Sequence, residues 1–357
     1  MRICILMTEE DPVLNEACTP NATPPGCYLP EHTWKVVELH GADARERIHE
    51  LWHDGWDVFL NLCDGMSHED SAGIEVVQTL EALGAAFTGS GSAFYEPSRA
   101  EQKRVCAELG ILTPACRFVT TPDAAEEVAA ELQFPLIVKH WNGYASIGID
   151  RGSKVDDVAA LKVRLEWACR EFGTALVEEF IEGREFTVLV SEPVAPRART
   201  AKAWHPIECR FPDGETFKHY DLKWVDFAGM SWHPVEEEVL ARRLMDASRK
   251  MFAGLRGTGY ARCDLRMDAA GRLYMLEINP NCGVFYPIEE YGSADFILVN
   301  DLGTPEHVGG HAGFLDHMFQ LAFRRQAVLQ RALLQRAMLQ KVAAGRGGRR
   351  RERTAQA

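Results

Sequence analysis

The sequence predicts a mixed α/β and α+β fold that begins with a small doubly wound domain and ends with a helix. In the first third, short apolar runs alternate with longer segments of helical periodicity, which is the pattern of a doubly wound domain. Near residue 270, two strand-like runs flank a tight turn and predict an antiparallel hairpin. A chain of 357 residues that is 46% hydrophobic is also too long for one small core, so we expect two or three subdomains.

The first domain is expected to span residues 1–97. Residues 1–7 are apolar but stop at Thr8, which is too short for a secretory segment or a membrane span and fits a buried strand. Residues 35–39 and 57–62 read as further strands, and residues 71–83 have helical periodicity.

A central subdomain is expected over residues 98–176. It should contain a helix over 98–109, a strand over 115–119, a helix over 122–132 and a buried strand over 134–139.

A loop of small residues, 141–149, follows the last of these strands directly after Lys139. Glycines let backbone amides close on phosphate oxygens, and a lysine neutralises charge that amides alone leave uncompensated. The loop by itself is a weak signal, because glycine loops between strands are common. Together with Lys139 it indicates an anion-binding site.

The third subdomain is expected over residues 177–318. Two strand-like runs flank a turn at Glu182 and Gly183, and their glutamates fit a solvated edge as well as a functional site. A polar, glycine-containing stretch near 213–232 carries lysine and aromatic residues. We interpret it as a lid that closes over phosphate and expels water.

The predicted hairpin carries the strongest chemical signal. If Met267 faces Arg272 across its turn, Asp264 and Glu277 become diagonal neighbours on one face. Two carboxylates so close repel each other unless a cation lies between them. Mg²⁺ is held by one or two carboxylates plus substrate phosphates, so these residues and Asn279 predict a nucleotide-metal site. A solvated hairpin face is the alternative, and the apolar run before Glu277 disfavours it.

The composition excludes several classes of protein. The net charge of -13 argues against a general nucleic-acid binder. The ten cysteines form no close pair of the CxxC type, which fits neither a zinc cluster nor a dense disulfide framework and indicates a reducing cytoplasm.

Residues 319–344 predict an amphipathic helix, and residues 345–357, rich in glycine and arginine, predict a disordered basic tail. The helix should either pack on the rest of the chain or pair with a second subunit in a homodimer. Binding to a membrane surface is the less favoured alternative, and no membrane partner is expected.

The chain resembles the ATP-grasp superfamily, and within it the D-alanine–D-alanine ligase family, over most of residues 50–300. The resemblance implies three subdomains, with ATP held between two antiparallel sheets. The matching pieces occur in the family's order: residues 65–70, 87–91, Val138 and Lys139 with the loop that follows, 177–188, 220–224, 261–264 and 277–283.

The resemblance implies roles for individual residues. Lys139 would contact nucleotide phosphate, with Ser146 in the phosphate loop, and Glu185 would bind the ribose hydroxyls. Asp264, Glu277 and Asn279 would ligate two Mg²⁺ ions, for which Mn²⁺ could substitute. The remaining implied residues are Glu178, Glu179, Phe180 and Ile181 around adenine, Arg99 at the nucleotide, Lys223 at the γ-phosphate, and Arg262 with the amide of Gly283 at the oxyanion of the tetrahedral intermediate.

The implied reaction joins a small-molecule carboxylate to an amine through an acyl phosphate and releases ADP and phosphate. The chain departs from the family around the amine: Asp64 replaces a histidine, and residues 284–291 replace small hydroxyl-bearing residues. Arg99 also stands where the family has lysine. We therefore expect a different amine acceptor, larger or cationic, in which Glu289 and Glu290 take part. The alternatives are a true D-alanine–D-alanine ligase, an ATP-grasp phosphotransferase or carboxylase, and a non-catalytic nucleotide-binding protein.

Overall fold

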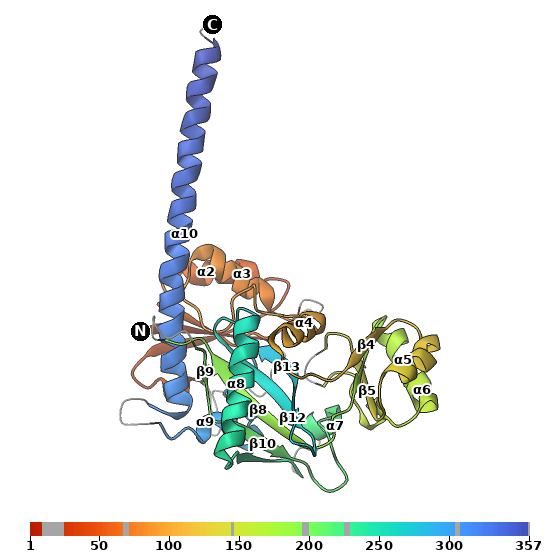
Figure 1. The fold of residues 1–357 in the computed structure, drawn as a ribbon. Coiled ribbons are helices and arrows are strands. Elements are labelled where there is room, and N and C mark those ends of the chain that lie inside the picture. Colours follow the sequence, from red (N-terminus) through yellow and green to blue (C-terminus); the bar gives the residue numbers. More distant parts are fainter. Residues whose placement is uncertain are drawn as a thin grey trace.

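A computed structural model of the chain describes residues 1–8, 25–66, 71–143, 146–194, 200–224, 229–303 and 308–355, with side chains left out for Trp224 and for 336–355. Part of the matching segment 65–70 therefore lies outside the described residues. The described residues form three sheets. Figure 1 shows the unit built from residues 116–179 set apart from the rest of the protein.

The N-terminal sheet is parallel and is covered on both faces. Along β1, Ile3, Ile5 and Met7 pack in one core cluster while Cys4 and Leu6 pack in another, as alternation along a strand requires. Helices α2 and α3 cover one face, and the start of α10 covers the other. This is the predicted doubly wound unit. Its elements are β1 (Arg2–Thr8), η2 (Pro25–Tyr28), β2 (Thr33–Leu39), α2 (Ala44–His53), β3 (Val58–Asn61) and α3 (Ile74–Leu83), with strand order β2-β1-β3.

The central sheet has four antiparallel strands in the order β4-β7-β5-β6, and two helices pack on one of its faces. The expected boundary after residue 176 falls inside β7, which pairs with β4 and β5, so this sheet extends to Glu179. The elements are β4 (Cys116–Val119), η3 (Pro122–Ala124), α5 (Ala125–Glu131), β5 (Leu136–His140), η4 (Arg151–Ser153), β6 (Lys154–Val155), α6 (Val158–Phe172) and β7 (Ala175–Glu179).

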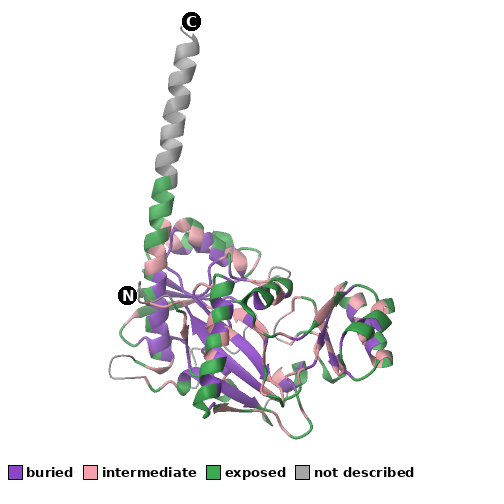
Figure 2. Ribbon diagram, viewed as in Figure 1, coloured by how far each residue is buried: buried purple, intermediate pink, exposed green. Residues whose placement is uncertain are grey.

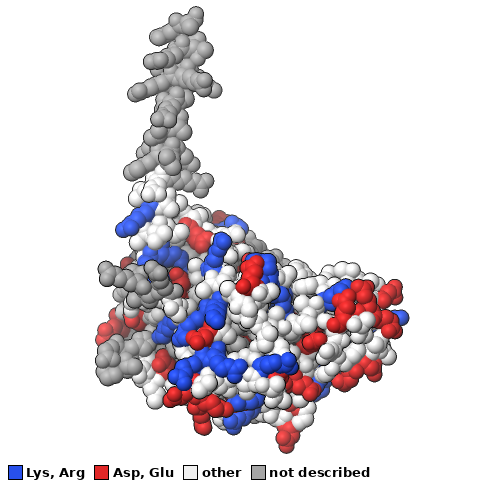
Figure 3. Space-filling view, in the orientation of Figure 1, with Lys and Arg blue, Asp and Glu red and all other residues white. Residues whose placement is uncertain are grey.

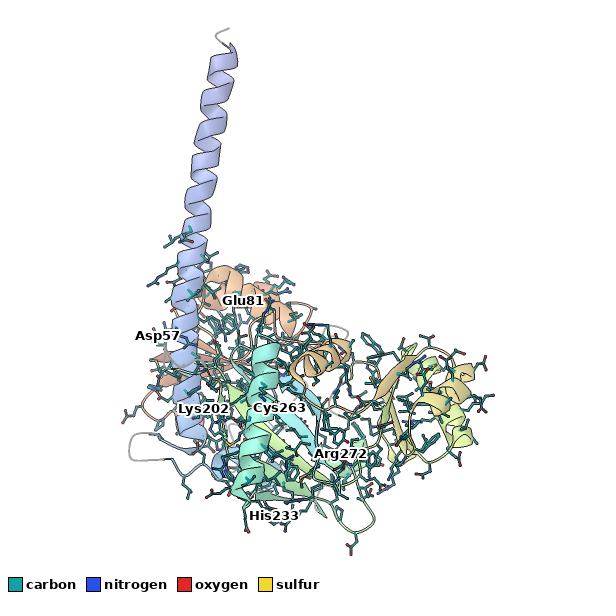
Figure 4. All side chains as sticks on the ribbon, viewed as in Figure 1. Asp57, Glu81, Lys202, His233, Cys263 and Arg272 are labelled. Carbon is teal, nitrogen blue, oxygen red and sulfur yellow. The ribbon has the colours of Figure 1, made fainter. Side chains whose placement is uncertain are left out.

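The largest sheet has an apolar face and a polar face. Along β12, Ala261, Cys263 and Leu265 point to the core under α8, and Figure 4 labels Cys263 beside that helix. Figure 2 shows that buried residues concentrate in these strands. The path is β11-β10-β8-β12-β13, with β9 on β8. The elements are α4 (Arg99–Leu109), β8 (Arg184–Ser191), β9 (Lys202–Ala203), β10 (Ile207–Arg210), α7 (Tyr220–Trp224), β11 (Ser231–Pro234), α8 (Glu238–Gly254), β12 (Tyr260–Met267) and β13 (Leu273–Pro280).

The two runs around Glu182 and Gly183 do not form a hairpin. They are β7 and β8, which belong to different sheets, so residues 180–183 form the crossover between the sheets. Gly183 has φ +134°, and a Cβ there would lie 2.1 Å from the carbonyl oxygen of Met267. Only glycine fits this close approach.

The C-terminal helix packs on the body of the protein, one of the two expected outcomes. The elements here are η6 (Ile288–Glu290), α9 (Ser293–Val299) and α10 (Gly310–Ala355). Phe314, Met318 and Phe319 enter the core with β1, and Arg324 donates to Glu192 at 3.1 Å. No helix among the described residues combines the length and apolar character needed to cross a membrane.

Helix α10 is longer than predicted at both ends. It begins at Gly310 rather than 319 and continues through residues 345–355, where we expected a disordered tail. No proline interrupts the segment, and alanine, glutamine and arginine are strong helix formers, so the backbone continues the helix past its glycines.

Charge is unevenly spread over the face seen in Figure 3, where basic side chains gather over α8 and acidic ones over α5. Helix α8 contributes Arg242, Arg243, Arg249 and Lys250 to this distribution.

Gly183→Ala should destabilise the protein by about 2 kcal/mol or more, because it combines backbone strain with a clash against a carbonyl. Gly173→Ala is the matched control: its φ is +71° but no atom lies within 4 Å of the added Cβ, so about 1 kcal/mol is expected. Thermal unfolding followed by circular dichroism compares the two. Equal losses would contradict a close approach at residue 183.

Candidate active site

A cleft of about 860 Å³ lies between the central sheet and the polar face of the large sheet. Residues of the N-terminal domain and of the segment after β13 complete its wall. Every site residue predicted from the sequence lines it: Arg99, Lys139, Ser146, Glu178, Glu179, Phe180, Ile181, Glu185, Lys223, Arg262, Asp264, Glu277, Asn279 and Gly283.

The floor of the cleft is formed by β12 and β13. Asp264 lies directly opposite Glu277, and Arg262 lies opposite Asn279. The predicted diagonal placement is wrong for two reasons: Met267 pairs with Leu273 rather than Arg272, and the pairing shifts by one further residue between Asp264 and Leu265. This bulge brings the two carboxylates closer together than a regular hairpin would.

Asp264 is held by three donors. Its carboxylate accepts hydrogen bonds from Arg262 Nη2 at 2.9 Å, Asn279 Nδ2 at 3.1 Å and Thr187 Oγ1 at 3.0 Å. Thr187 was not predicted, although it alternates with Glu185 along β8 and so lies on the same face.

Glu277 pairs with Arg99, the first residue of α4. Burial raises the pKa of Glu277, but the charges of Arg99 and Lys139 outweigh burial and Asp264, so the net pKa is lowered. Arg99 Nη2 also donates to Gly143 O at 2.8 Å. The arginine therefore connects the predicted metal face with the glycine loop.

Glu178 is 2% exposed and pairs with both Lys139 and Lys103. Burial raises its pKa, but the two ammonium groups outweigh burial and lower the pKa to about 2. Lys103 was not predicted. It lies one helical turn after Arg99 on α4, a spacing that places both side chains on one face.

A second buried arginine, Arg266, holds the crossover between the sheets. It donates to Glu185 Oε2 at 3.0 Å and to Ile181 O at 2.8 Å, and its guanidinium stacks on Phe180. Lys218 pairs with the other oxygen of Glu185 at 2.8 Å. Sequence reasoning missed Arg266, although its alternation with Arg262 and Asp264 places it on the cleft face.

The predicted lid contacts the glycine loop. Ser146 Oγ donates to Lys218 O at 3.2 Å, Tyr220 N donates to Ile149 O at 2.8 Å, and Arg151 pairs with Glu215 at 2.7 Å. Residues 144–145 of the loop and 225–228 of the lid lie outside the described residues.

Lys223, on α7 of the lid, faces a strongly basic environment. Burial, together with the charges of Arg262 and Lys218, lowers its pKa to about 7. Nearby Glu277 and Asp264 oppose this shift but do not cancel it. A phosphate bound beside Lys223 would favour its protonated form.

The lining of the cleft also includes residues from the N-terminal domain and from the segment after β13. These are Asp64, Tyr286, Glu289 and Glu290, and Tyr286 lies beside Gly283. The acidic residues that the sequence associated with the amine acceptor therefore share one cleft with the predicted nucleotide residues.

Comparison with known proteins identifies the lineage. A family model described as "D-ala D-ala ligase C-terminus" matches residues 107–287. The D-alanine–D-alanine ligase of Herminiimonas arsenicoxydans is 30% identical over 263 residues, which cover 70% of this chain and 74% of the relative. That of Aromatoleum aromaticum is 31% identical over 252 residues, covering 70% and 76%.

Solved structures agree in fold. The D-alanine–D-alanine ligase from Bacillus anthracis complexed with ATP has a TM-score of 0.63 at 20% identity, covering 92% of this chain and 99% of that one. The VanG D-Ala:D-Ser ligase from Enterococcus faecalis has a TM-score of 0.63 at 14% identity, covering 90% and 99%. The chain belongs to the D-alanine–D-alanine ligase-like family of ATP-grasp ligases.

Proposed function

We propose that this chain is an ATP-dependent carboxylate–amine ligase that acts through an acyl phosphate and uses an amine acceptor other than D-alanine. The observation that carries the proposal is the floor of the cleft. There Asp264 and Glu277 oppose each other beside Arg262 and Asn279, and Lys139 and Lys223 line the same space.

ATP would bind between the two antiparallel sheets. Adenine would be surrounded by Phe180, Ile181 and the residues around Glu178. The ribose would be bound by Glu185, and the phosphates by Lys139 and the loop that contains Ser146. Support comes from the lining of the cleft and from the ion pairs that fix Glu178 and Glu185 before any ligand binds. Preformed contacts of this kind reduce the ordering cost of binding.

The residues at the floor fit Mg²⁺, or Mn²⁺ in its place. Two carboxylates and one carboxamide offer hard oxygen ligands on one face. Among the described residues, no group of three or more His, Cys, Asp or Glu side chains forms a metal site made of protein ligands alone. Mg²⁺ usually takes several of its ligands from phosphate and water, so Asp264, Glu277 and Asn279 would be enough ligands from the protein. Bound there, the ions would neutralise charge on the transferring phosphate.

The chemistry needs positioning rather than a protein nucleophile. An oxygen of the donor carboxylate attacks the γ-phosphorus, the bond to the β-phosphate oxygen breaks, and ADP leaves. The amine nitrogen then attacks the acyl carbon, and phosphate leaves as the nitrogen loses a proton. Arg262 and the amide of Gly283 would stabilise the oxyanion of the tetrahedral intermediate.

An acyl phosphate hydrolyses if water reaches it, which gives the lid its purpose. The contacts of Ser146 and Tyr220 join the lid to the phosphate loop. Closure of the two segments over ATP would therefore exclude water from the intermediate.

Asp64, Glu289 and Glu290 support a different acceptor. All three line the cleft, so D-alanine as acceptor would bring a further carboxylate into it, and like charges disfavour that ligand. A cationic or larger amine meets no such repulsion. The second candidate is a true D-alanine–D-alanine ligase, which the names of the curated relatives favour.

Phosphate release with paired amino acids and amines, followed by mass spectrometry of the product, tests the proposal. We expect an amide with an acceptor that carries an additional positive charge, and weak or no product with D-alanine alone. Efficient D-alanyl-D-alanine synthesis would establish the second candidate instead. ATP binding without any condensed product would contradict ligase function.

Glu277→Gln should lower amide formation on the order of 10²-fold or more, the scale of losing one preorganised charge contact at the reacting phosphate. ATP binding should persist, because Lys139 and the adenine wall are unchanged. Glu171→Gln, an exposed glutamate on α6, is the control and should retain full activity. Equal rates for the two variants would indicate that the predicted metal face is not catalytic.

ATP binding should take up protons at pH 8. Lys223 has a pKa near 7 in the ATP-free protein, and phosphate beside it would raise that value, so the complex holds more protons above pH 7. Apparent affinity for ATP should therefore fall as pH rises through this window.

Calorimetry in buffers of different ionisation enthalpy measures this uptake. Lys223→Met should abolish it, whereas Lys162→Met, a substitution on the exposed side of α6, should leave it unchanged. The same uptake in the wild type and in Lys223→Met would show that another group titrates.

A further inference from the structure

One carboxylate, that of Asp295, accepts hydrogen bonds from both ends of the loop that follows Gly283. This loop, residues 284–292, joins β13 to α9 and brings Tyr286, Glu289 and Glu290 to the cleft. Near its start, Phe285 N donates to Asp295 Oδ1 at 2.7 Å. At its end, Gly292 N donates to Asp295 Oδ2 at 3.2 Å.

Asp295 is in turn held by His311, from the first turn of α10. His311 Nε2 lies 2.8 Å from Asp295 Oδ1, and the two residues are 4% and 0% exposed. The imidazole stacks on Tyr28, with ring centroids 4.9 Å apart. Figure 1 shows α9 beside the lower end of α10, where this contact forms.

The backbone of the loop needs such support. Phe285 is buried and has φ +73°, a left-handed conformation that a bulky residue rarely adopts. Its amide hydrogen bond to Asp295 and its packing against the His311 ring oppose relaxation to an ordinary conformation. Relaxation would move the neighbouring Tyr286 at the wall of the cleft.

We propose that Asp295 and His311 are positioning residues that hold residues 284–292 in the shape that receives the amine acceptor. This inference rests on the proposed ligase function. Neither side chain lines the cleft, so both act through the loop and through the residues it presents. The pair sets affinity for the acceptor and leaves ATP binding and acyl phosphate formation unchanged.

The test compares His311→Leu, which removes the ring nitrogens, with His311→Gln, which keeps a donor. His317→Leu is the matched control. His317 is also a buried histidine of α10, but its Nε2 lies 2.8 Å from Ser191 Oγ and 2.9 Å from Glu192 O, away from the loop. Loss of a buried histidine destabilises both leucine variants, so stability alone does not distinguish them.

We expect His311→Leu to raise the KM for the acceptor roughly tenfold or more, the scale of losing a group that orients a site. The KM for ATP and the donor-dependent release of phosphate without acceptor should stay unchanged. His311→Gln should restore much of the acceptor affinity, and His317→Leu should not affect it. An unchanged acceptor KM, or a parallel rise in both KM values, would overturn the inference.

Hydrogen exchange separates this inference from the proposed function. Amides of residues 284–292 should exchange faster in His311→Leu than in the wild type or in His317→Leu. If wild-type protein binds ATP but forms no amide, the ligase proposal fails, and exchange still decides whether the pair holds the loop. Unchanged exchange would refute the positioning role.

Discussion

The arrangement of the cleft depends on two carboxylates that face each other across a bulged hairpin. Asp264 and Glu277 would repel if left alone, and the protein opposes this with cations on either side. Arg262 holds Asp264 from the same strand, while Arg99 reaches Glu277 from α4. A buried carboxylate is tolerated only with such compensation, so the helix, the hairpin and the glycine loop are positioned together.

Two further carboxylates in the lining of the cleft are also paired with cations. Glu178 lies between two lysines, and Glu185 lies between Lys218 and Arg266. Each carboxylate thus fixes cations from more than one segment, including the lid. These ion pairs bring cations from β5, β12 and the lid to the lining of the cleft, which suits a polyanionic ligand.

Residue identity and alternation made part of this site predictable. Asp264, Glu277 and Asn279 were found because strand periodicity places them on one face, and the family pattern supplied the segments far from them in sequence. The bulge at Asp264 was not predictable, since it depends on how β12 pairs with β8 as well as β13. The assignment of β7 and β8 to different sheets was missed for a similar reason, because local sequence does not encode which partner a strand meets. Alternation along β12 and helical spacing along α4 already placed Arg266 and Lys103 on the right faces, but their buried partners, Glu185 and Glu178, became known only from the structure.

The crossover at residues 180–183 forms the wall beside the predicted adenine position and also joins the two sheets. Gly183 and Arg266 fix its path through contacts with the backbone. A change that reshapes this wall to accept another base would therefore also alter the angle between the sheets. Residues 284–292 are supported by a separate pair of side chains, Asp295 and His311, so that loop could change shape while the connection between the sheets stayed intact.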